Sequence, residues 1–278
     1  YTIPSDTVCY PAKLVHGHIE ALIREGANVI FYPDMTYNID EKLGDDHFNC
    51  PVVAYYPQVV KLNISDINKT TFICDFVSLA KKDDFLRRMR AILKKYFPYK
   101  KIPLKAVKAA TEAAYAEYAD YLENIRKKGE ELIEKAKATG KPVILLAGRP
   151  YHIDPEINHG INELIERLGA MVLSEDSIRP EKTNLDTNVR NQWTYHARMY
   201  NAAKFVANAP ENLDIHLVQL VSFGCGVDAV TTDEVRRIVQ SSDRLYAQIK
   251  IDEISNIGAV TIRLRSLMSV LELRNKNK

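Results

Sequence analysis

The chain has 278 residues, enough to bury a substantial core and to form one or two domains of ordinary size. Its 46% hydrophobic and 27% charged residues are typical of a soluble globular protein. No stretch approaches the roughly 20 apolar residues of a membrane-spanning helix, which excludes a membrane protein of that kind. The formal net charge is +2, and basic residues are interspersed with acidic ones, which argues against a nucleic-acid-binding surface.

The cysteines and the start of the chain indicate the cellular compartment. The four cysteines have no close spacing and no signal peptide precedes them, so a secreted disulfide framework is not expected. We therefore expect a cytoplasmic protein. In the reducing cytosol the thiols would stay free to bind metal. The sequence begins at Tyr1 and not at a methionine, which indicates a piece of a longer polypeptide.

Helix and strand patterns alternate through the first hundred residues. Pro11 suits the first turn of a helix whose apolar residues recur at helical spacing until Gly26. Pro57 favours a kink in the next apolar stretch, and β-branched and aromatic residues mark a later strand. These patterns predict a strand over 28–33, a short kinked helix over 50–62, a strand over 70–77 and a helix over 82–97.

One long helix is predicted in the middle of the chain. From Leu104 to about Ala138 the sequence is rich in Ala, Glu, Lys and Leu, it contains no proline, and Gly140 follows. A helix of this length suits a connection between two lobes. We therefore divide the chain into a first lobe over 1–100, truncated at its N-terminus, a linking helix over 101–139 and a second lobe over 140–278.

The second half of the chain has the pattern of a parallel sheet covered on both faces. Its first strand, 142–147, is a continuous apolar run of the kind found in such sheets. A helix over 156–168, a strand over 170–173, a helix over 191–203, a strand over 214–222 and a helix over 232–244 follow. A last helix presents one apolar face made of Val260, Leu264, Leu267, Met268 and Leu271. The alternation predicts an α/β protein with two doubly wound, Rossmann-like or flavodoxin-like parallel-sheet lobes joined by a long helix.

Three of the cysteines precede predicted helices. Cys9 lies two residues before Pro11, Cys50 lies directly before a proline, and Cys225 follows a strand and precedes a helix capped by Thr231 or Thr232. A helix N-terminus favours the thiolate, which is the form that binds metal, and its N–H groups can donate to cluster sulfides. Such thiols could hold a [4Fe–4S] cluster by three irons, or they could be incidental loop residues. Cys74 lies within an apolar strand and is expected to be a buried structural thiol.

The glycines around Cys225 allow a different interpretation. The stretch from Gly224 to Ala229 matches G-x-G-x-x-A, follows a strand and opens a helix, and Asp252 stands where a ribose-binding acid is expected. A dinucleotide site therefore stays open as an alternative. Against it, a cysteine at the position that faces the pyrophosphate has no evident role.

A further candidate site follows the first strand of the second half. Gly148 allows a tight exit from the strand, Arg149 could reach an anionic ligand or a negatively charged cluster, and His152 could donate hydrogen bonds. The alternative is a solvated turn in which Asp154 caps the next helix.

Five ordered stretches of the chain resemble a known family: SDTVCYPAKLVHGHI, FNCPVVAYYPQVV, GRPYHIDPEINHGI, SFGCGVDAVTTDEV and KIDEISNIGAVTIRLRSL. They are similar to the acyl-CoA dehydratase activase-related proteins, also described as CoA-substrate-specific enzyme activases. In that family, ATPase domains are followed by regions similar to the cluster-binding subunits of 2-hydroxyacyl-CoA dehydratases. The resemblance implies that this chain is a region of the second kind.

The resemblance also implies a ligand set. Dehydratase-like subunits hold a [4Fe–4S] or double-cubane cluster between two α/β domains through three cysteines, and the match places these at Cys9, Cys50 and Cys225. Gly224 and Gly226 would then let the backbone approach the cluster because they have no Cβ, and Arg149 would lie nearby. A cluster of this kind can be absent after preparation in air.

The expected function follows from that ligand set. We expect a redox region that accepts a low-potential electron and reduces a small substrate such as an acyl-CoA. The sequence has no Walker A motif, so ATP hydrolysis belongs to an activator domain outside this chain, fused or separate. The alternatives are a non-catalytic docking or regulatory module of a larger ATPase, or a dinucleotide-binding domain that uses residues 224–229.

Overall fold

The computed structural model describes residues 3, 5, 7–180, 185–222, 224–251 and 257–276. The described residues form two compact units, each built around a parallel sheet, and the long helix α4 (Leu104–Thr139) contributes to both. The expected α/β class, with two parallel sheets and a long helix between them in the chain, is confirmed. The first unit comprises 1–41, 45–121 and 192–194, and the second comprises 42–44, 122–191 and 195–278.

The first unit has a two-stranded parallel sheet. Strand β1 pairs with β2 so that Val29 lies opposite Thr71 and Phe31 opposite Ile73. Its elements before α4 are α1 (Tyr10–Arg24), β1 (Val29–Phe31), α2 (Pro51–Asn63), the 3₁₀ helix η1 (Ser65–Lys69), β2 (Thr71–Ile73) and α3 (Lys82–Tyr96). Helix α3 packs on the end of β2 through Ile92, which belongs to one buried cluster with Ile73 and Val77.

One local prediction for this unit needs adjustment, and another is confirmed. The predicted strand over 70–77 is much shorter, because β2 spans only Thr71–Ile73. The helix predicted over 50–62 is confirmed as α2, which spans Pro51–Asn63 with the buried Pro57 inside it.

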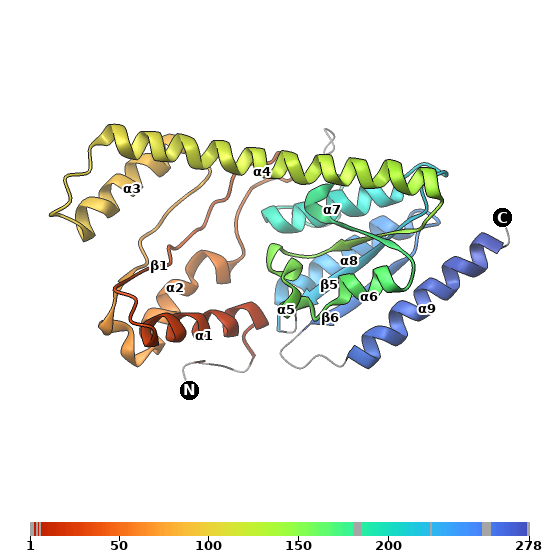
Figure 1. Cartoon of the computed structure of the whole chain (residues 1–278), viewed down its shortest axis with the longest axis horizontal. Coiled ribbons are helices and arrows are strands. Elements are labelled where there is room, and N and C mark those ends of the chain that lie inside the picture. The colour runs from red at the N-terminus through yellow and green to blue at the C-terminus, as the bar shows by residue number, and fades with distance from the viewer. Residues whose placement is uncertain are drawn as a thin grey trace. The chain divides into compact units, whose positions relative to one another are not determined.

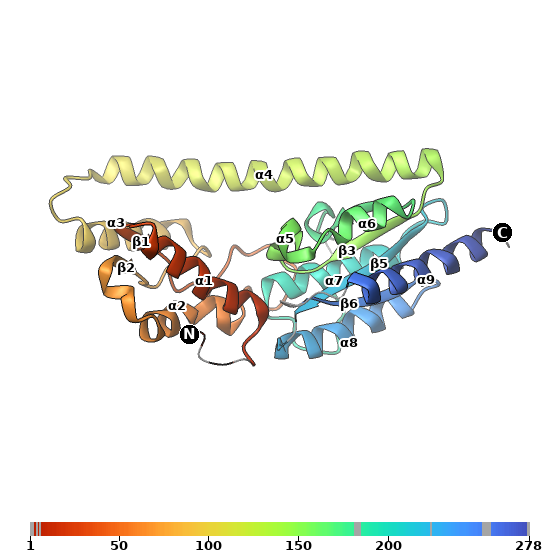
Figure 2. The same ribbon diagram turned by 60° about the horizontal axis from the view of Figure 1, so that its bottom comes forward.

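The second unit has a four-stranded parallel sheet in the order β4-β3-β5-β6. Figures 1 and 2 show its helices on both sides of the strands. Its elements after α4 are β3 (Val143–Ala147), η2 (Pro150–Ile153), α5 (Pro155–Asn158), α6 (Ile161–Arg167), β4 (Met171–Ser174), η3 (Glu175–Ser177), α7 (Thr194–Ala207), β5 (Ile215–Ser222), α8 (Gly226–Gln240), β6 (Tyr246–Ile251) and α9 (Ile257–Lys276).

The core of the second unit lies on both faces of this sheet. All residues of β3 and β5 are buried, as predicted for strands covered on both sides. Alternate residues of β3 join the cluster formed with α7, α8 and the end of α4. Helices α6 and α9 contact each other and the strands β4 and β6. The predicted apolar face of α9 is buried: Val260, Leu264, Leu267, Met268 and Leu271.

Three predictions for this unit are corrected. The predicted helix over 156–168 is divided into α5 and α6, because His159 and Gly160 adopt left-handed backbone with φ of 54° and 72°. Strand β6 was not predicted, although it pairs with β5 along its whole length. Helix α8 begins at Gly226 and not near position 232.

Candidate functional site

The candidate residues of the second unit gather where the strand order reverses. Strands β3 and β5 are neighbours, but the chain leaves β3 toward β4 and then crosses to the other side for β5. Ligands of open α/β sheets bind outside the carboxyl ends of strands at such a reversal. Arg149 follows the end of β3 and Cys225 follows the end of β5, so both lie at this position.

Cys225 is the residue that caps helix α8. It has extended backbone, with φ of −85° and ψ of 102°, and its side chain is half-buried. Gly224 makes the turn before it with φ of 74°, a conformation that disfavours other residues. The predicted caps Thr231 and Thr232 lie inside the helix, where Thr231 Oγ1 donates to the Val227 carbonyl at 3.0 Å. The prediction that Cys225 stands at a helix start is confirmed, with the start even closer than expected.

A buried arginine contacts this cysteine. Arg149 Nη1 donates to Cys225 Sγ at 2.9 Å, and Nη2 donates to the Asp228 carboxylate. Asp228 Oδ2 also accepts from the Ser222 N–H at 2.9 Å. Burial raises the pKa of Asp228 above its ordinary value, although Arg149 and the Ser222 amide favour the carboxylate. The buried Arg149 guanidinium is therefore shared between the Cys225 sulfur and the Asp228 carboxylate.

A second set of contacts fixes the turn that carries Arg149. The Arg149 N–H donates to His152 Nδ1 at 3.0 Å, so the imidazole proton is on Nε2, which lies 3.4 Å from Ser222 Oγ. Burial and then the charge of Arg149 lower the pKa of His152 well below its ordinary value, which keeps the ring neutral. The Tyr151 and Ser222 hydroxyls are 2.5 Å apart. Gly148 is required here, because a Cβ would lie 2.5 Å from His152 Nδ1.

The solvated-turn alternative is correct in part, since Pro150 and Ile153 are exposed. Asp154 does cap the following helix, since its Oδ1 accepts from the amides of Glu156 and Ile157 at 2.9 and 3.3 Å. Arg149 and His152, however, are 6% and 1% exposed, so the turn presents these two side chains inward.

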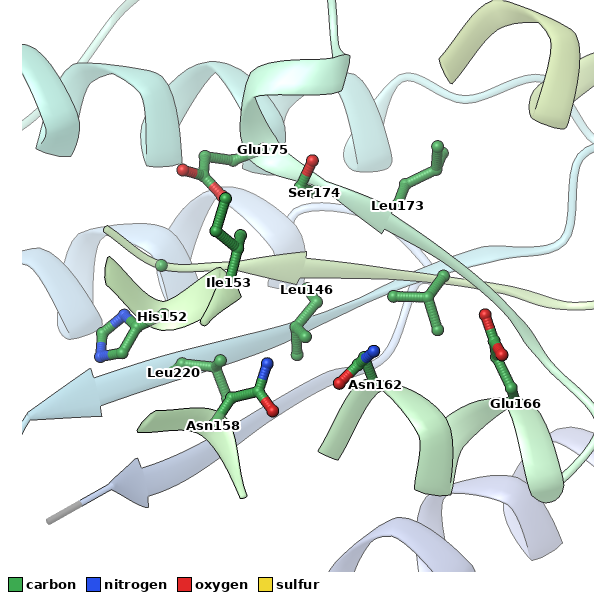
Figure 3. A pocket seen from close by; sticks show the side chains of 12 residues that line it. Leu146, His152, Ile153, Asn158, Asn162, Glu166, Leu173, Ser174, Glu175 and Leu220 are labelled. Carbon is green, nitrogen blue, oxygen red and sulfur yellow. The ribbon is translucent and has the colours of Figure 1, made fainter. Parts of the chain in front are cut away.

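A cavity of about 260 Å³ adjoins His152 (Figure 3). Glu175, at the end of β4, is 4% exposed, and burial followed by the nearby Asp176 raises its pKa to about 8. Asn162 Oδ1 is buried without a hydrogen-bond partner among the described residues. Sequence reasoning missed both side chains, although Glu175 directly follows a strand, where ligand-facing residues are common. The cavity is lined by Leu146, Gly148, His152, Ile153, Asn158, Asn162, Glu166, Val172, Leu173, Ser174, Glu175 and Leu220.

Two of the predicted cysteines belong to the first unit. Cys9 is the cap of α1 and Cys50 the cap of α2, each with extended backbone and a proline in the first helical turn. Tyr32 directly follows β1, and its pKa is raised to about 12, mainly by burial, with contributions from Tyr56 and from both thiols. Asp34 also contributes to this shift, ahead of the two thiols.

Cys74 differs from the other three cysteines in its position. It is 7% exposed and follows β2, as expected of a structural thiol, and none of the four cysteines forms a disulfide. Within either unit, the described residues contain no group of three or more His, Cys, Asp or Glu side chains arranged to hold a metal ion. An approach of Cys225 to Cys9 and Cys50 stays a prediction. Asp252, the predicted ribose-binding acid, lies outside the described residues.

Comparison with known proteins gives one family. Residues 1–178 match the family described as the CoA enzyme activase uncharacterised domain (DUF2229), which confirms the activase part of the resemblance. The matched range contains Cys9, Cys50 and Arg149, and it ends before Cys225. A search of curated proteins found no match. No helix in the described ranges has the length and apolar character needed to span a membrane.

Proposed function

The chain belongs to the CoA enzyme activase uncharacterised domain family, and we propose that it is an iron–sulfur cluster-binding region that serves low-potential electron transfer. Cys9, Cys50 and Cys225 would be the ligands. The electron would come from an ATP-dependent activator domain, fused or separate, and the final acceptor would be a small substrate such as an acyl-CoA.

The placement of the cysteines at helix starts carries this proposal. Cys9, Cys50 and Cys225 are each the cap residue of a helix of 13 to 15 residues, whereas Cys74 is not. The first N–H groups of a helix have no partner within it and carry partial positive charge. They favour a thiolate and can donate to inorganic sulfide, which suits an iron–sulfur ligand set better than an incidental loop thiol.

The surroundings of the three thiols fit the same group. Cys9 and Cys50 come from one unit, while Cys225 comes from the other and accepts a hydrogen bond from Arg149. Together they would make up a three-cysteine ligand set that neither unit has alone. A bound cluster would supply one-electron chemistry at low potential. Arg149, which is paired with Asp228, would hold Cys225 in position through its hydrogen bond.

Gly226 gives independent support. It is the first residue of α8, directly after Cys225, and a Cβ built on it would have no atom of the described residues within 4 Å. The protein alone therefore gives no steric reason for a glycine there. A ligand that approaches the backbone beside Cys225 would give one.

The dinucleotide alternative keeps its structural context, because residues 224–229 lie between β5 and α8. A titration with nicotinamide and flavin cofactors separates it from the iron–sulfur proposal. A docking module with vestigial cysteines would bind neither these cofactors nor iron.

Anaerobic reconstitution tests the proposal. The purified chain is supplied with iron and sulfide under nitrogen, and bound iron, bound sulfide, the visible spectrum and the electron paramagnetic resonance spectrum of the reduced protein are measured. We expect iron and sulfide in similar amounts and a paramagnetic signal on reduction. A chain that keeps neither element would contradict the proposal.

A further inference from the structure

A second cavity, of about 720 Å³, lies in the first unit and is not used by the proposed function. Its volume is within the range typical of sites for small molecules. It lies past the carboxyl ends of β1 and β2, the edge of a parallel sheet where ligands usually bind. We refer to it as the α3 cavity, and its walls include Tyr37, His47, Phe76, Lys81, Arg87 and Arg88.

Two aromatic rings line the α3 cavity and are held there by the backbone. Phe76 forms a parallel bridge with Asp34, and the Leu79 N–H donates to the Tyr37 carbonyl at 3.0 Å. The Tyr37 ring packs against Phe48, with ring centroids 4.8 Å apart. The segments after the two strands therefore hold both rings in place, which provides flat apolar surfaces for an aromatic ligand.

Cationic side chains surround these rings. Arg87 forms an ion pair with Asp84, which neutralises one charge of each sign. Lys81 and Arg88 form no ion pair in the part of the chain that the structure describes, and the Arg88 guanidinium carbon is 5.8 Å from the centroid of the Phe76 ring. The lining thus keeps two positive charges without an ion pair, and one of them, Arg88, lies beside the Phe76 ring. Such groups bind phosphate well.

We propose that the α3 cavity binds a ligand in which phosphate groups are joined to a flat aromatic ring, as in a nucleotide. Lys81 and Arg88 would contact the phosphates, and Tyr37 and Phe76 would contact the ring. A free nucleotide and the nucleotide part of coenzyme A share this chemistry. The site does not depend on iron, because none of the residues that line it is a cysteine.

Calorimetric titration of the iron-free chain tests this site. ADP and coenzyme A are titrated separately, and adenosine and pyrophosphate serve as probes that lack the phosphates or the ring. We expect ADP or coenzyme A to bind about tenfold more tightly than either partial probe, and the tighter of the two identifies the source of the ligand. Affinity should fall as the salt concentration rises. If neither full probe binds more tightly than pyrophosphate, the proposal is wrong.

Matched variants distinguish this cavity from a general surface charge. Arg88→Gln should weaken ADP binding about tenfold. Arg90→Gln removes the same charge from an exposed position of the same helix that does not line the cavity. This control should change the affinity less than about twofold. Phe76→Leu should weaken ADP binding but leave pyrophosphate binding unchanged. Equal effects of the two arginine variants would overturn the proposal. Titration of the Cys225→Ala chain should give wild-type affinity, so failure here is distinguishable from failure of iron binding.

Discussion

A buried carboxyl group at the end of β4 makes the stability of this protein depend on pH in an unusual direction. Glu175 is 4% exposed, and burial, reinforced by Asp176, raises its pKa from 4.5 to about 8. Near neutral pH the folded protein therefore holds a proton that the unfolded chain has released. Linkage requires the free energy of unfolding to fall as the pH rises through this window.

The size of the effect follows from the same values. The difference between a pKa of 4.5 and a pKa of about 8 corresponds to about 5 kcal/mol. The contribution of Glu175 is complete below pH 4.5, decreases between pH 4.5 and 8, and is lost above that. Glu175→Gln keeps the shape and remains neutral, so the variant should lack this decrease.

Urea unfolding followed by circular dichroism at pH 5.5 and pH 9 measures the difference. We expect Glu175→Gln to be more stable than the wild type by several kcal/mol at pH 9 and by much less at pH 5.5. Glu166→Gln is the matched control, because Glu166 lines the same cavity but is exposed, and its pH dependence should follow the wild type. Parallel pH profiles for the wild type and Glu175→Gln would refute the reasoning.

Three further substitutions, two of them with a matched control, test other parts of the structure. In urea unfolding, Leu264→Ala on the buried face of α9 should lower the free energy of unfolding by about 2–5 kcal/mol. Its control, Ile262→Ala, changes a position that is 68% exposed and should lower it by less than about 0.5 kcal/mol. Arg149→Ala should lower the free energy of unfolding by about 3–5 kcal/mol in the same assay, because Asp228 would stay buried without its partner. Its control, Arg167→Ala, removes an exposed ion pair with Glu163 and should lower it by less than about 1 kcal/mol. Gly226→Ala should raise the stability by about 0.5 kcal/mol and yet reduce the iron bound after reconstitution; unchanged iron would argue against a ligand at that position.

The sequence predicts elements whose apolar pattern is strong. The face of α9 repeats at helical spacing, and all five predicted residues are buried. Strand β3 is an unbroken apolar run, and all its positions are buried. The helix starts after Cys9 and Cys50 are predictable because proline fixes the backbone of the first turn.

Weaker local signals account for the errors. Strand β6 combines half-buried residues with an exposed lysine, so its pattern lacks a run of apolar residues. Thr231 and the acidic residues after it look like a helix start, but its hydroxyl bonds back to a carbonyl within α8. His159 gives no sequence warning of its left-handed backbone, which divides α5 from α6.

The contacts of the candidate site could not be predicted from spacing. Arg149 and Cys225 are 76 residues apart, and they meet because β3 pairs with β5 so that both carboxyl ends reach the same edge. Asp228 precedes the helix predicted over 232–244, yet it lies in the first turn of α8, is buried and pairs with Arg149. A sequence shows which chemical groups are present, whereas strand register decides which of them touch.

Iron retention by single-cysteine variants tests the central claim most directly. After anaerobic reconstitution and passage over a chelating column, iron per chain is measured for Cys9→Ala, Cys50→Ala, Cys225→Ala and Cys74→Ala. We predict that each of the first three variants loses most of its iron while Cys74→Ala keeps the wild-type amount. Wild-type retention by any of the three cap variants, or equal losses in all four, would contradict a shared cluster.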